Sequence, residues 1–240
     1  MVRSGSVTTA TGPAALRRLL LEPLPVGERV LPPLGLVVAA AIGAILLLAV
    51  ATARWFDPGD LGDSHAYWLA ARRLLDGLPL YDPAASPVEP FAYWYPPVVA
   101  QALAPFAAVL PAQAFSFGWI AVLLGCTWGL AGRRPLVTLA LVAFVPVALE
   151  LWFRNVHLVL AVLLVLAIRR WPALFAVGAA IKFAPGVGLA YLAARRRWRD
   201  LAIAAGAGAA ILVVSVALAP DAWRQYVDIL LARGGATEAS

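Results

Sequence analysis

Asp63 is the residue whose type and position most directly suggest catalysis. It lies in the polar segment 56–95, which follows an apolar run and holds six of the 13 acidic residues. A carboxylate there could act as a general base that removes a proton from an incoming hydroxyl group. Alternatively, Asp63 or Ser64 could be the N-cap of a helix, because short polar side chains accept hydrogen bonds from the first helical turn. His65 could relay the proton or contact a headgroup, or it could be an ordinary loop residue.

Lys182 is the second candidate, as the only lysine among 19 basic residues and within an apolar stretch. A charge near the middle of a membrane costs at least ~2.5 kcal/mol on insertion scales, so such a residue usually has a partner. The partner could be Glu150 or the phosphate of a bound lipid. Glu150 itself belongs to a polar group with Arg154, Asn155 and His157. These residues could pair with one another or line a cavity.

The segment FAYWYPP, residues 91–97, places four aromatic side chains before a double proline. Such a segment is typical of the aromatic belt at a membrane interface. Large flat rings, those of Tyr93 and Tyr95 among them, could also stack on a sugar ring. The sequence leaves both interpretations open.

Metal and cofactor chemistry has little support. Asp57 and Asp60 precede Asp63 at a spacing that would suit a divalent cation, but a solvated acidic loop explains them more simply. Cys126 is the only cysteine, so no intrachain disulfide can form and no Cys/His cluster offers a zinc site. No dinucleotide, ATP or zinc-protease motif occurs. We therefore predict neither a metal nor a cofactor.

The elements that must position these residues are membrane helices. Of the 240 residues, 62% are hydrophobic and only 13% are charged, against roughly 25% charged in soluble domains. Several apolar runs approach the ~20 residues that cross a hydrocarbon core as a helix. The predicted fold class is an all-α polytopic membrane protein with about seven transmembrane helices. The net charge of +6 is carried mostly by arginines between apolar runs, which fits membrane topology better than nucleic-acid binding.

We divide the chain into a cytoplasmic N-terminal segment, 1–33, a membrane domain, 34–219, and an outer tail, 220–240. The membrane domain includes an outer loop, 56–95, because arginines precede the first span and acidic residues follow it. An amphipathic helix that stops at Gly77 is expected in this loop, lying along the membrane surface. The expected spans are 34–55, 96–110, 112–132, 135–153, 156–169, 172–194 and 200–219.

The arginines set one conflict in this topology. With the N-terminus inside, the cluster within 195–199 falls inside, as the positive-inside rule requires, but Arg133/Arg134 and Arg169/Arg170 fall outside. A re-entrant segment, which enters and leaves the membrane on the same side, would change the number of spans and with it the side on which these arginines lie. The glycines and proline within 178–188 make 172–194 the candidate for it.

Four motifs together resemble a known family: D-S-H-A-Y-W-L-A-A at 63–71, G-L-P-L-Y at 77–81, Y-P-P at 95–97, and I-K-F-A-P with R-R-R-W-R within 181–199. In order and spacing, over the chain from residue 34 onward, they are similar to the polyprenol-phosphate-mannose-dependent mannosyltransferases of glycosyltransferase family 87. The resemblance implies the N-terminal part of a C-type glycosyltransferase fold.

The resemblance also implies a function. It indicates a multi-pass enzyme of the cell envelope that moves mannose from a polyprenyl-phosphate donor to an extracytoplasmic lipid or glycan acceptor, with inversion and on the outer face of the cell membrane. Asp63 matches the family's presumed base, and Lys182 and Pro185 match its Lys-x-x-Pro. Its partners would be donor, acceptor and membrane lipids, without nucleic acid. The candidate substrate-binding residues are Lys182, His65, Tyr93, Tyr95, Asn155 and His157.

Two features depart from the family pattern. The family's Gly-Gln-x-Asn corresponds here to Arg154-Asn155-Val156-His157, and family members continue for further spans, so we expect a C-terminally truncated chain. The alternatives are a transporter or flippase-like protein, or an inactive truncated relative. A Lys182 partner in the same cavity as Asp63 would favour transfer chemistry, whereas polar residues continuous between the membrane faces would favour transport.

Overall fold

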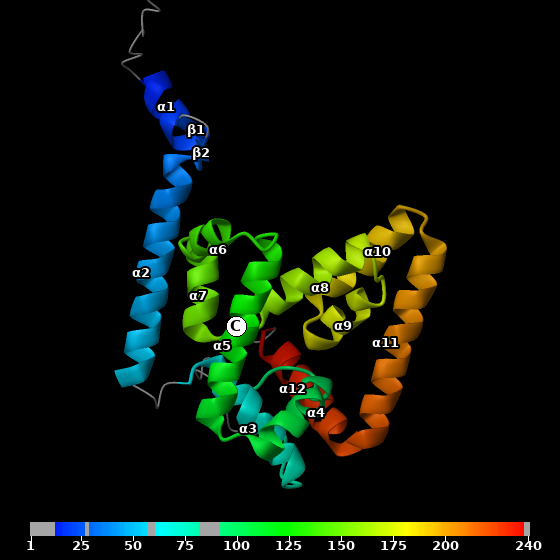
Figure 1. The fold of residues 1–240 in the computed structure, drawn as a ribbon. Coiled ribbons are helices and arrows are strands. Elements are labelled where there is room, and N and C mark those ends of the chain that lie inside the picture. The colour runs from blue at the N-terminus through cyan, green and yellow to red at the C-terminus, as the bar shows by residue number, and fades with distance from the viewer. Residues whose placement is uncertain (1–12, 27–28, 57–60, 82–91, 238–240) are drawn as a thin grey trace, which may run out of the picture. The chain divides into compact units, whose positions relative to one another are not determined.

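The computed structural model describes residues 13–26, 29–56, 61–81 and 92–237, most of which are helical (Figure 1). Asp57, Asp60 and the acidic residues of 82–91 lie outside the described residues. The chain divides into two compact units, one made of residues 1–53 and 127–148 and the other of residues 54–126 and 149–240. The helical class predicted from composition is confirmed.

The first unit contains α1 (Pro13–Leu21), most of α2 (Leu34–Phe56), α6 (Pro135–Val142) and the antiparallel pair β1 (Leu24–Val26) and β2 (Arg29–Leu31). Helices α2 and α6 approach very closely, since a Cβ atom on Gly43 would lie 1.7 Å from the carbonyl oxygen of Leu139. The expected span 135–153 is not one straight helix. The chain bends by 79° between α6 and α7 (Val145–Phe153).

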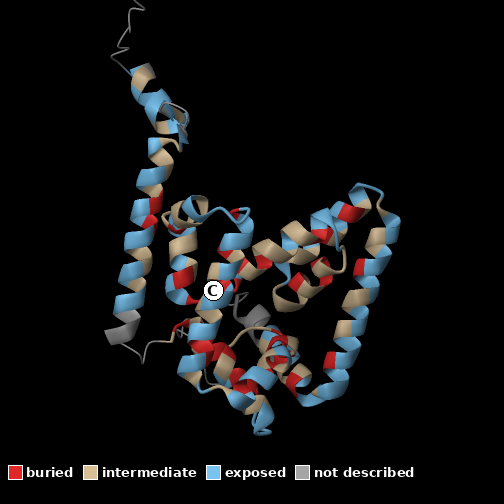
Figure 2. Cartoon of the chain, viewed as in Figure 1, coloured by how far each residue is buried: buried red, intermediate tan, exposed pale blue. Residues whose placement is uncertain are grey.

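The second unit carries every described residue of the candidate site. It contains α3 (Asp63–Leu75), α4 (Pro97–Val109), most of α5 (Ala112–Leu130), α8 (His157–Arg169), α9 (Leu174–Ile181), η1 (Ala184–Gly186), α10 (Val187–Ala194), α11 (Trp198–Leu218) and α12 (Pro220–Thr237). Figure 2 shows that buried residues gather in α3 and α4, which pack on each other. The amphipathic face of α3 is therefore covered by protein along α4.

Helix α3 begins differently from the prediction. The N-cap position is Gly62, and no side chain caps the helix. The Ser64 hydroxyl instead donates to the carbonyl oxygen of Leu61 and shares a hydrogen bond with Ser116 Oγ at 2.7 Å. The prediction that Asp63 or Ser64 caps this helix is therefore wrong, and the Asp63 carboxylate is free for contacts outside the helix.

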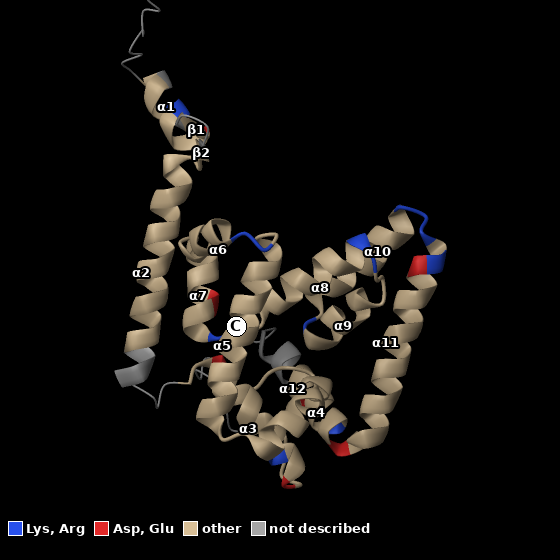
Figure 3. Cartoon of the chain, viewed as in Figure 1, with Lys and Arg blue, Asp and Glu red and all other residues tan. Residues whose placement is uncertain are grey.

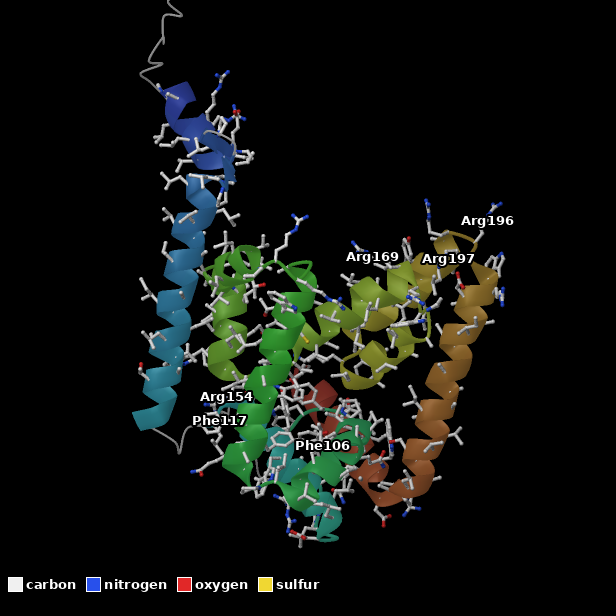
Figure 4. All side chains as sticks on the ribbon, in the orientation of Figure 1. Phe106, Phe117, Arg154, Arg169, Arg196 and Arg197 are labelled. Carbon is white, nitrogen blue, oxygen red and sulfur yellow. The ribbon has the colours of Figure 1, made fainter. Side chains whose placement is uncertain are left out.

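Segment 172–194 is a hairpin of two short helices. A Cβ atom on Gly188 of α10 would lie 1.9 Å from the ring of Phe175 in α9, so only glycine permits this approach. Ala167, Phe175, Leu192 and Ala204 form one buried cluster, which brings together the end of α8, the start of α9, the end of α10 and the start of α11. Figure 4 accordingly shows Arg169, Arg196 and Arg197 at the same end of these helices.

The described residues include three helices that are long and apolar enough to cross a membrane. They are Leu34–Thr52, Ala112–Leu130 and Trp198–Leu218, and the bent pair α6 and α7 would make a fourth. Figure 3 shows charged residues at the start of α11 and in α12, which follows it, but none along the middle of α11, as a membrane span requires. The protein is thus a helical membrane protein, and the number of seven spans stays a prediction.

Candidate active site

The junction between α7 and α8 supplies three side chains of the site. Helix α7 ends at Phe153, and Arg154 then adopts a left-handed conformation with φ of 57°. The amide of Asn155 donates back to the carbonyl oxygen of Glu150 at 3.2 Å, a bond typical of a helix C-terminus that ends in such a residue. This tight reversal brings Glu150 next to His157, the first residue of α8.

Gly62 brings the start of α3 against this junction. Its φ and ψ of 55° and −154° belong to a region that is essentially restricted to glycine. A Cβ atom at Gly62 would lie 2.6 Å from the carbonyl oxygen of Phe153. The backbone of the next residue, Asp63, can therefore approach the α7–α8 junction only because residue 62 lacks a side chain.

Asp63 then joins a group of hydrogen-bonded side chains that we call the base cluster: Asp63, Asn155, Tyr95 and Tyr67. Asn155 Nδ2 donates to Asp63 Oδ2 at 2.5 Å. Asn155 Oδ1 accepts from the backbone amide of Val156 at 2.7 Å and from the Tyr95 hydroxyl at 3.3 Å. The hydroxyl groups of Tyr67 and Tyr95 lie 3.1 Å apart. Three separate segments of the chain, namely α3, the residues before α4 and the α7–α8 junction, thus meet around one carboxylate.

The surroundings of Asp63 make it a better base than an exposed aspartate. Burial raises the pKa of its carboxyl group above the usual value of 3.8, Glu150 raises it further, and Lys182 and His157 oppose the rise. A higher pKa gives a carboxylate more affinity for the proton it must remove. Burial also raises the pKa of Tyr95 to about 12, so its hydroxyl remains a hydrogen-bond donor at neutral pH.

A second group, which we call the lysine cluster, consists of Lys182, His157 and Glu150. Lys182 Nζ lies 2.7 Å from His157 Nε2, and His157 Nδ1 lies 2.7 Å from Glu150 Oε1. Because an ammonium group can only donate, Nε2 of the histidine is the acceptor, and its Nδ1–H therefore donates to the carboxylate. Glu150 Oε2 also accepts from the His157 amide at 3.0 Å. Lys182 and Glu150 are thus linked through His157.

Tyr95 belongs to the base cluster and also contacts the lysine cluster. Its hydroxyl donates to Asn155, and its ring lies under Lys182, with Nζ 5.4 Å from the ring centroid. An ammonium group over an aromatic face is attracted by the ring's negative face. The carboxylate of Asp63, through Asn155, and the ammonium group of Lys182 are therefore both linked to Tyr95.

An apolar cavity of about 520 Å³ opens beside the lysine cluster. His157, Lys182 and Tyr191 are its residues with polar groups, and the remaining lining from α8, α9, η1 and α10 is apolar. Leu160, Leu164 and Ile168 line it along one face of α8. The cavity therefore has one cationic end and apolar walls, which suits a long apolar molecule with an anionic head.

The remaining candidate residues lie at the edge of the site. Tyr93 donates to the carbonyl oxygen of Pro96 and accepts from the amide of Ala100, both at 3.0 Å, so its hydroxyl group fixes the start of α4. His65 stacks beside Trp68 with ring centroids 6.2 Å apart, and its buried Nδ1 has no hydrogen-bond partner among the described residues. Within the same residues, no three acidic, histidine or cysteine side chains gather as a metal site.

Two residues of the site were not among the predicted site residues. Tyr67 follows Asp63 by four residues, and the two side chains therefore lie on the same face of α3. Glu150 was considered as a partner for Lys182 and as a member of a polar group with His157, but not as a site residue. Its contact with His157 spans seven residues across a helix end, which no local periodicity indicates.

These features define a helical membrane protein with a partly buried carboxylate, a nearby ammonium group and an apolar cavity. The model of glycosyltransferase family 87 matches residues 93–239. The match covers more than half of the chain, and the chain therefore belongs to glycosyltransferase family 87. No curated protein and no solved structure gives a significant match. Family membership supports glycosyltransferase activity in general.

Proposed function

We propose that the protein transfers a sugar, mannose in the first instance, from a polyprenyl-phosphate donor to a lipid or glycan acceptor outside the cytoplasm. Asp63 is the general base in this proposal. It takes the proton of an acceptor hydroxyl group while the hydroxyl oxygen forms a bond to C1 of the sugar. The bond between C1 and the phosphate oxygen breaks on the opposite face, and polyprenyl phosphate leaves. The configuration at C1 is therefore inverted.

Lys182 and the apolar cavity fit the donor in this proposal. A polyprenyl phosphate combines an anionic head with a long apolar chain, and the cavity has the complementary arrangement. The ammonium group of Lys182 would offset the negative charge that the phosphate gains as it leaves. The prenyl chain would lie along α8, away from His157.

The observation that carries the proposal is that Asp63, through Asn155, and Lys182, over the ring, are both linked to Tyr95. A base and a phosphate-binding cation must lie on either side of the same sugar for the transfer to occur. This arrangement favours transfer over the alternative of a transporter, for which a polar path between the membrane faces would be required.

We also propose that the site lies on the outer face of the membrane and that the protein has the N-terminal part of a C-type arrangement. Arg169 and Arg196 lie at the same end of the helical group (Figure 4), which the positive-inside rule assigns to the cytoplasm. The site lies at the opposite end of α8, whose 13 residues extend about 20 Å. That distance is most of a ~30 Å hydrocarbon core.

The orientation can be tested by cysteine labelling. Leu78 follows α3 and is 54% exposed, so Leu78→Cys in a Cys126→Ala background should react with an impermeant maleimide in intact cells. Arg196→Cys should react only after permeabilisation. The reverse pattern would place the site on the cytoplasmic side and overturn the proposed orientation.

The activity itself is tested by reconstitution. The purified chain in liposomes should transfer radiolabelled mannose from polyprenyl-phosphate mannose to a lipid extract of cell envelope, and the product should have the inverted anomeric configuration. Absence of transfer with this donor, or a product with retained configuration, would refute the proposal. If the chain transfers no sugar at all, the result would also support the alternative of an inactive relative.

A further inference from the structure

We propose that Asn155 is a positioning residue that fixes the orientation of the Asp63 carboxylate. The inference rests on the proposed function, in which Asp63 is the base, and assigns to Asn155 a role other than contact with the sugar. The direct bond from Asn155 Nδ2 to Asp63 Oδ2 is its first support.

The orientation of the Asn155 amide is determined by its other hydrogen bonds. The Val156 backbone amide and the Tyr95 hydroxyl both lie within bonding distance of the same atom, Oδ1, at 2.7 and 3.3 Å. A backbone N–H can only donate, so that atom must be the carbonyl oxygen. The NH₂ group is therefore the one that faces Asp63. If the side-chain amide were flipped, its NH₂ group would face the Val156 N–H, and its oxygen would face the Asp63 carboxylate. Neither pair could form a hydrogen bond.

The backbone around Asn155 holds this geometry in place. The backbone N–H of Asn155 donates to the backbone carbonyl oxygen of Glu150 near the end of α7, and Val156 precedes the first turn of α8. Val156 is 3% exposed and belongs to a buried cluster with Tyr67 and Leu160. Asn155 is thus supported from both helices, as a residue that orients a catalytic group must be.

The charged groups around Asp63 cannot supply the same orientation. Lys182, His157 and Glu150 act on its carboxylate electrostatically, but the hydrogen bonds of Lys182 and Glu150 go to His157. Asn155 makes the direct bond, and this bond engages Oδ2. The acceptor's proton is therefore expected at Oδ1, which fixes the side from which the acceptor approaches C1.

The first experiment measures ionisation of Asp63 without activity. In the full chain labelled with ¹³C-carboxyl aspartate, the infrared band of Asp63 is isolated by subtraction of the spectrum of Asp63→Asn and followed with pH. Asn155→Ala removes a donor to the ionised carboxylate, so the titration of Asp63 should move to higher pH. An unchanged titration in a folded Asn155→Ala protein would overturn the proposal.

Gln101→Ala is the matched control. Gln101 also uses both ends of its amide, donating to the Ser215 carbonyl oxygen and accepting from the Ser215 hydroxyl, but it joins α4 to α11. Its removal leaves similar unpaired groups without touching Asp63, so the Asp63 band should titrate as in the unmodified protein. A shift equal to that of Asn155→Ala would mean that general loosening moves the band, and would refute the specific role.

The second experiment separates positioning from substrate binding. Asn155→Ala should lower kcat about 10-fold or more, as expected for loss of a hydrogen bond to a charged group, with KM for donor and acceptor nearly unchanged. A raised KM with unchanged kcat would show that Asn155 binds substrate, and would overturn the proposal. If the unmodified chain transfers no sugar while the infrared shift is present, the proposed function fails and the link between Asn155 and Asp63 stands.

Discussion

The base cluster and the lysine cluster differ in how firmly the protein holds them. Asp63 is partly buried and is bonded to Asn155, which is bonded in turn to Val156 and Tyr95. The side chain of His157, by contrast, is 50% exposed, and Lys182 lies at a break between two short helices beside an open cavity. Side chains from several segments therefore hold the base cluster in place, whereas the lysine cluster borders an open cavity.

This difference corresponds to two tasks in the proposed reaction. A base must be in position before the acceptor arrives, because small errors in its placement cost rate. A cation that binds a phosphate must exchange partners, leaving His157 for the donor and returning after release. The comparison therefore predicts that changes in the base cluster lower kcat, whereas changes in the lysine cluster weaken donor binding.

The largest expected effect is that of Asp63→Asn. The variant keeps an oxygen that accepts from Asn155 but removes the proton acceptor, so transfer should fall ~10²-fold or more. Steady-state kinetics with saturating donor and acceptor measure this. Asp76→Asn, at the exposed end of the same helix, where Asp76 pairs with Arg72, should leave the rate unchanged. Equal losses in both variants would remove Asp63 from the role of base.

The Asp63→Asn change should lower the activity without lowering the stability of the protein. The folded pKa of Asp63 lies above its unfolded value, so ionising this group costs stability in the folded protein. That penalty is complete above the folded pKa and disappears as the pH falls below the unfolded value near 3.8. At neutral pH, Asp63→Asn should therefore unfold at a temperature no lower than the unmodified protein. For activity, the acid limb of the pH profile should lie above pH 3.8.

Lys182→Met tests the other cluster and should have the next largest effect. If Lys182 binds the donor phosphate, its loss removes a charge-assisted hydrogen bond, and donor affinity should fall about 10-fold or more. Affinity can be measured by titration with polyprenyl phosphate. Arg224→Met, in an exposed pair with Asp221, is the control of equal charge and should bind the donor normally.

The double variant Lys182→Met/Glu150→Gln separates phosphate binding from internal charge pairing. If Lys182 mainly compensates Glu150 through His157, the single variant should give poor detergent-solubilised yield, and Glu150→Gln should restore it. If Lys182 serves the phosphate, the single variant should be obtained in normal yield and the double variant should bind donor no better. Unchanged donor affinity in a well-folded Lys182→Met protein would contradict the proposed phosphate site.

Much of the helical arrangement could be predicted from apolar runs and their breaks. The expected spans 34–55 and 200–219 correspond closely to α2 and α11, and the Gly/Pro pattern identified the break within 172–194. The bend after Val142 was not predicted from the apolar pattern of 135–153, although Pro146 near the start of α7 is a residue type that interrupts helices. Hydrophobicity alone does not distinguish a straight helix from a bent one.

The members of the site could be predicted better than their connections. Asp63 stood out by its place in the polar segment 56–95, and Lys182, Asn155 and His157 stood out because polar residues are costly among apolar helices. The bond between Asp63 and Asn155, however, joins residues 92 positions apart. It depends on the close approach of α3 and α7 that Gly62 permits. A single sequence records a glycine there but not the carbonyl group that it faces.

Gly62→Ala tests whether backbone contact holds the base cluster together. The change combines a backbone conformation that costs of order 1–3 kcal/mol for a residue with a side chain with a contact 2.6 Å from the Phe153 carbonyl oxygen. Thermal stability and kcat should both fall, and donor affinity should change less. Gly77→Ala is the matched control, since Gly77 has φ of 68° but no atom within 4 Å of the added Cβ. It should lose some stability and keep its kcat, and an equal loss of kcat would assign the effect to strain alone.

Tyr95→Phe should have the smallest effect, and it most directly separates the role of the base cluster in kcat from the role of the lysine cluster in donor affinity. The variant removes the hydroxyl group that donates to Asn155 but keeps the ring under Lys182. Because a neutral hydrogen bond contributes about 0.5–1.5 kcal/mol, kcat should fall roughly 2- to 10-fold, while donor affinity stays unchanged. Tyr95→Leu removes the ring as well, so donor affinity should then fall in addition. If Tyr95→Phe weakened donor binding as much as Tyr95→Leu, the hydroxyl group would serve the donor, and the base and lysine clusters would have to be regarded as one binding surface.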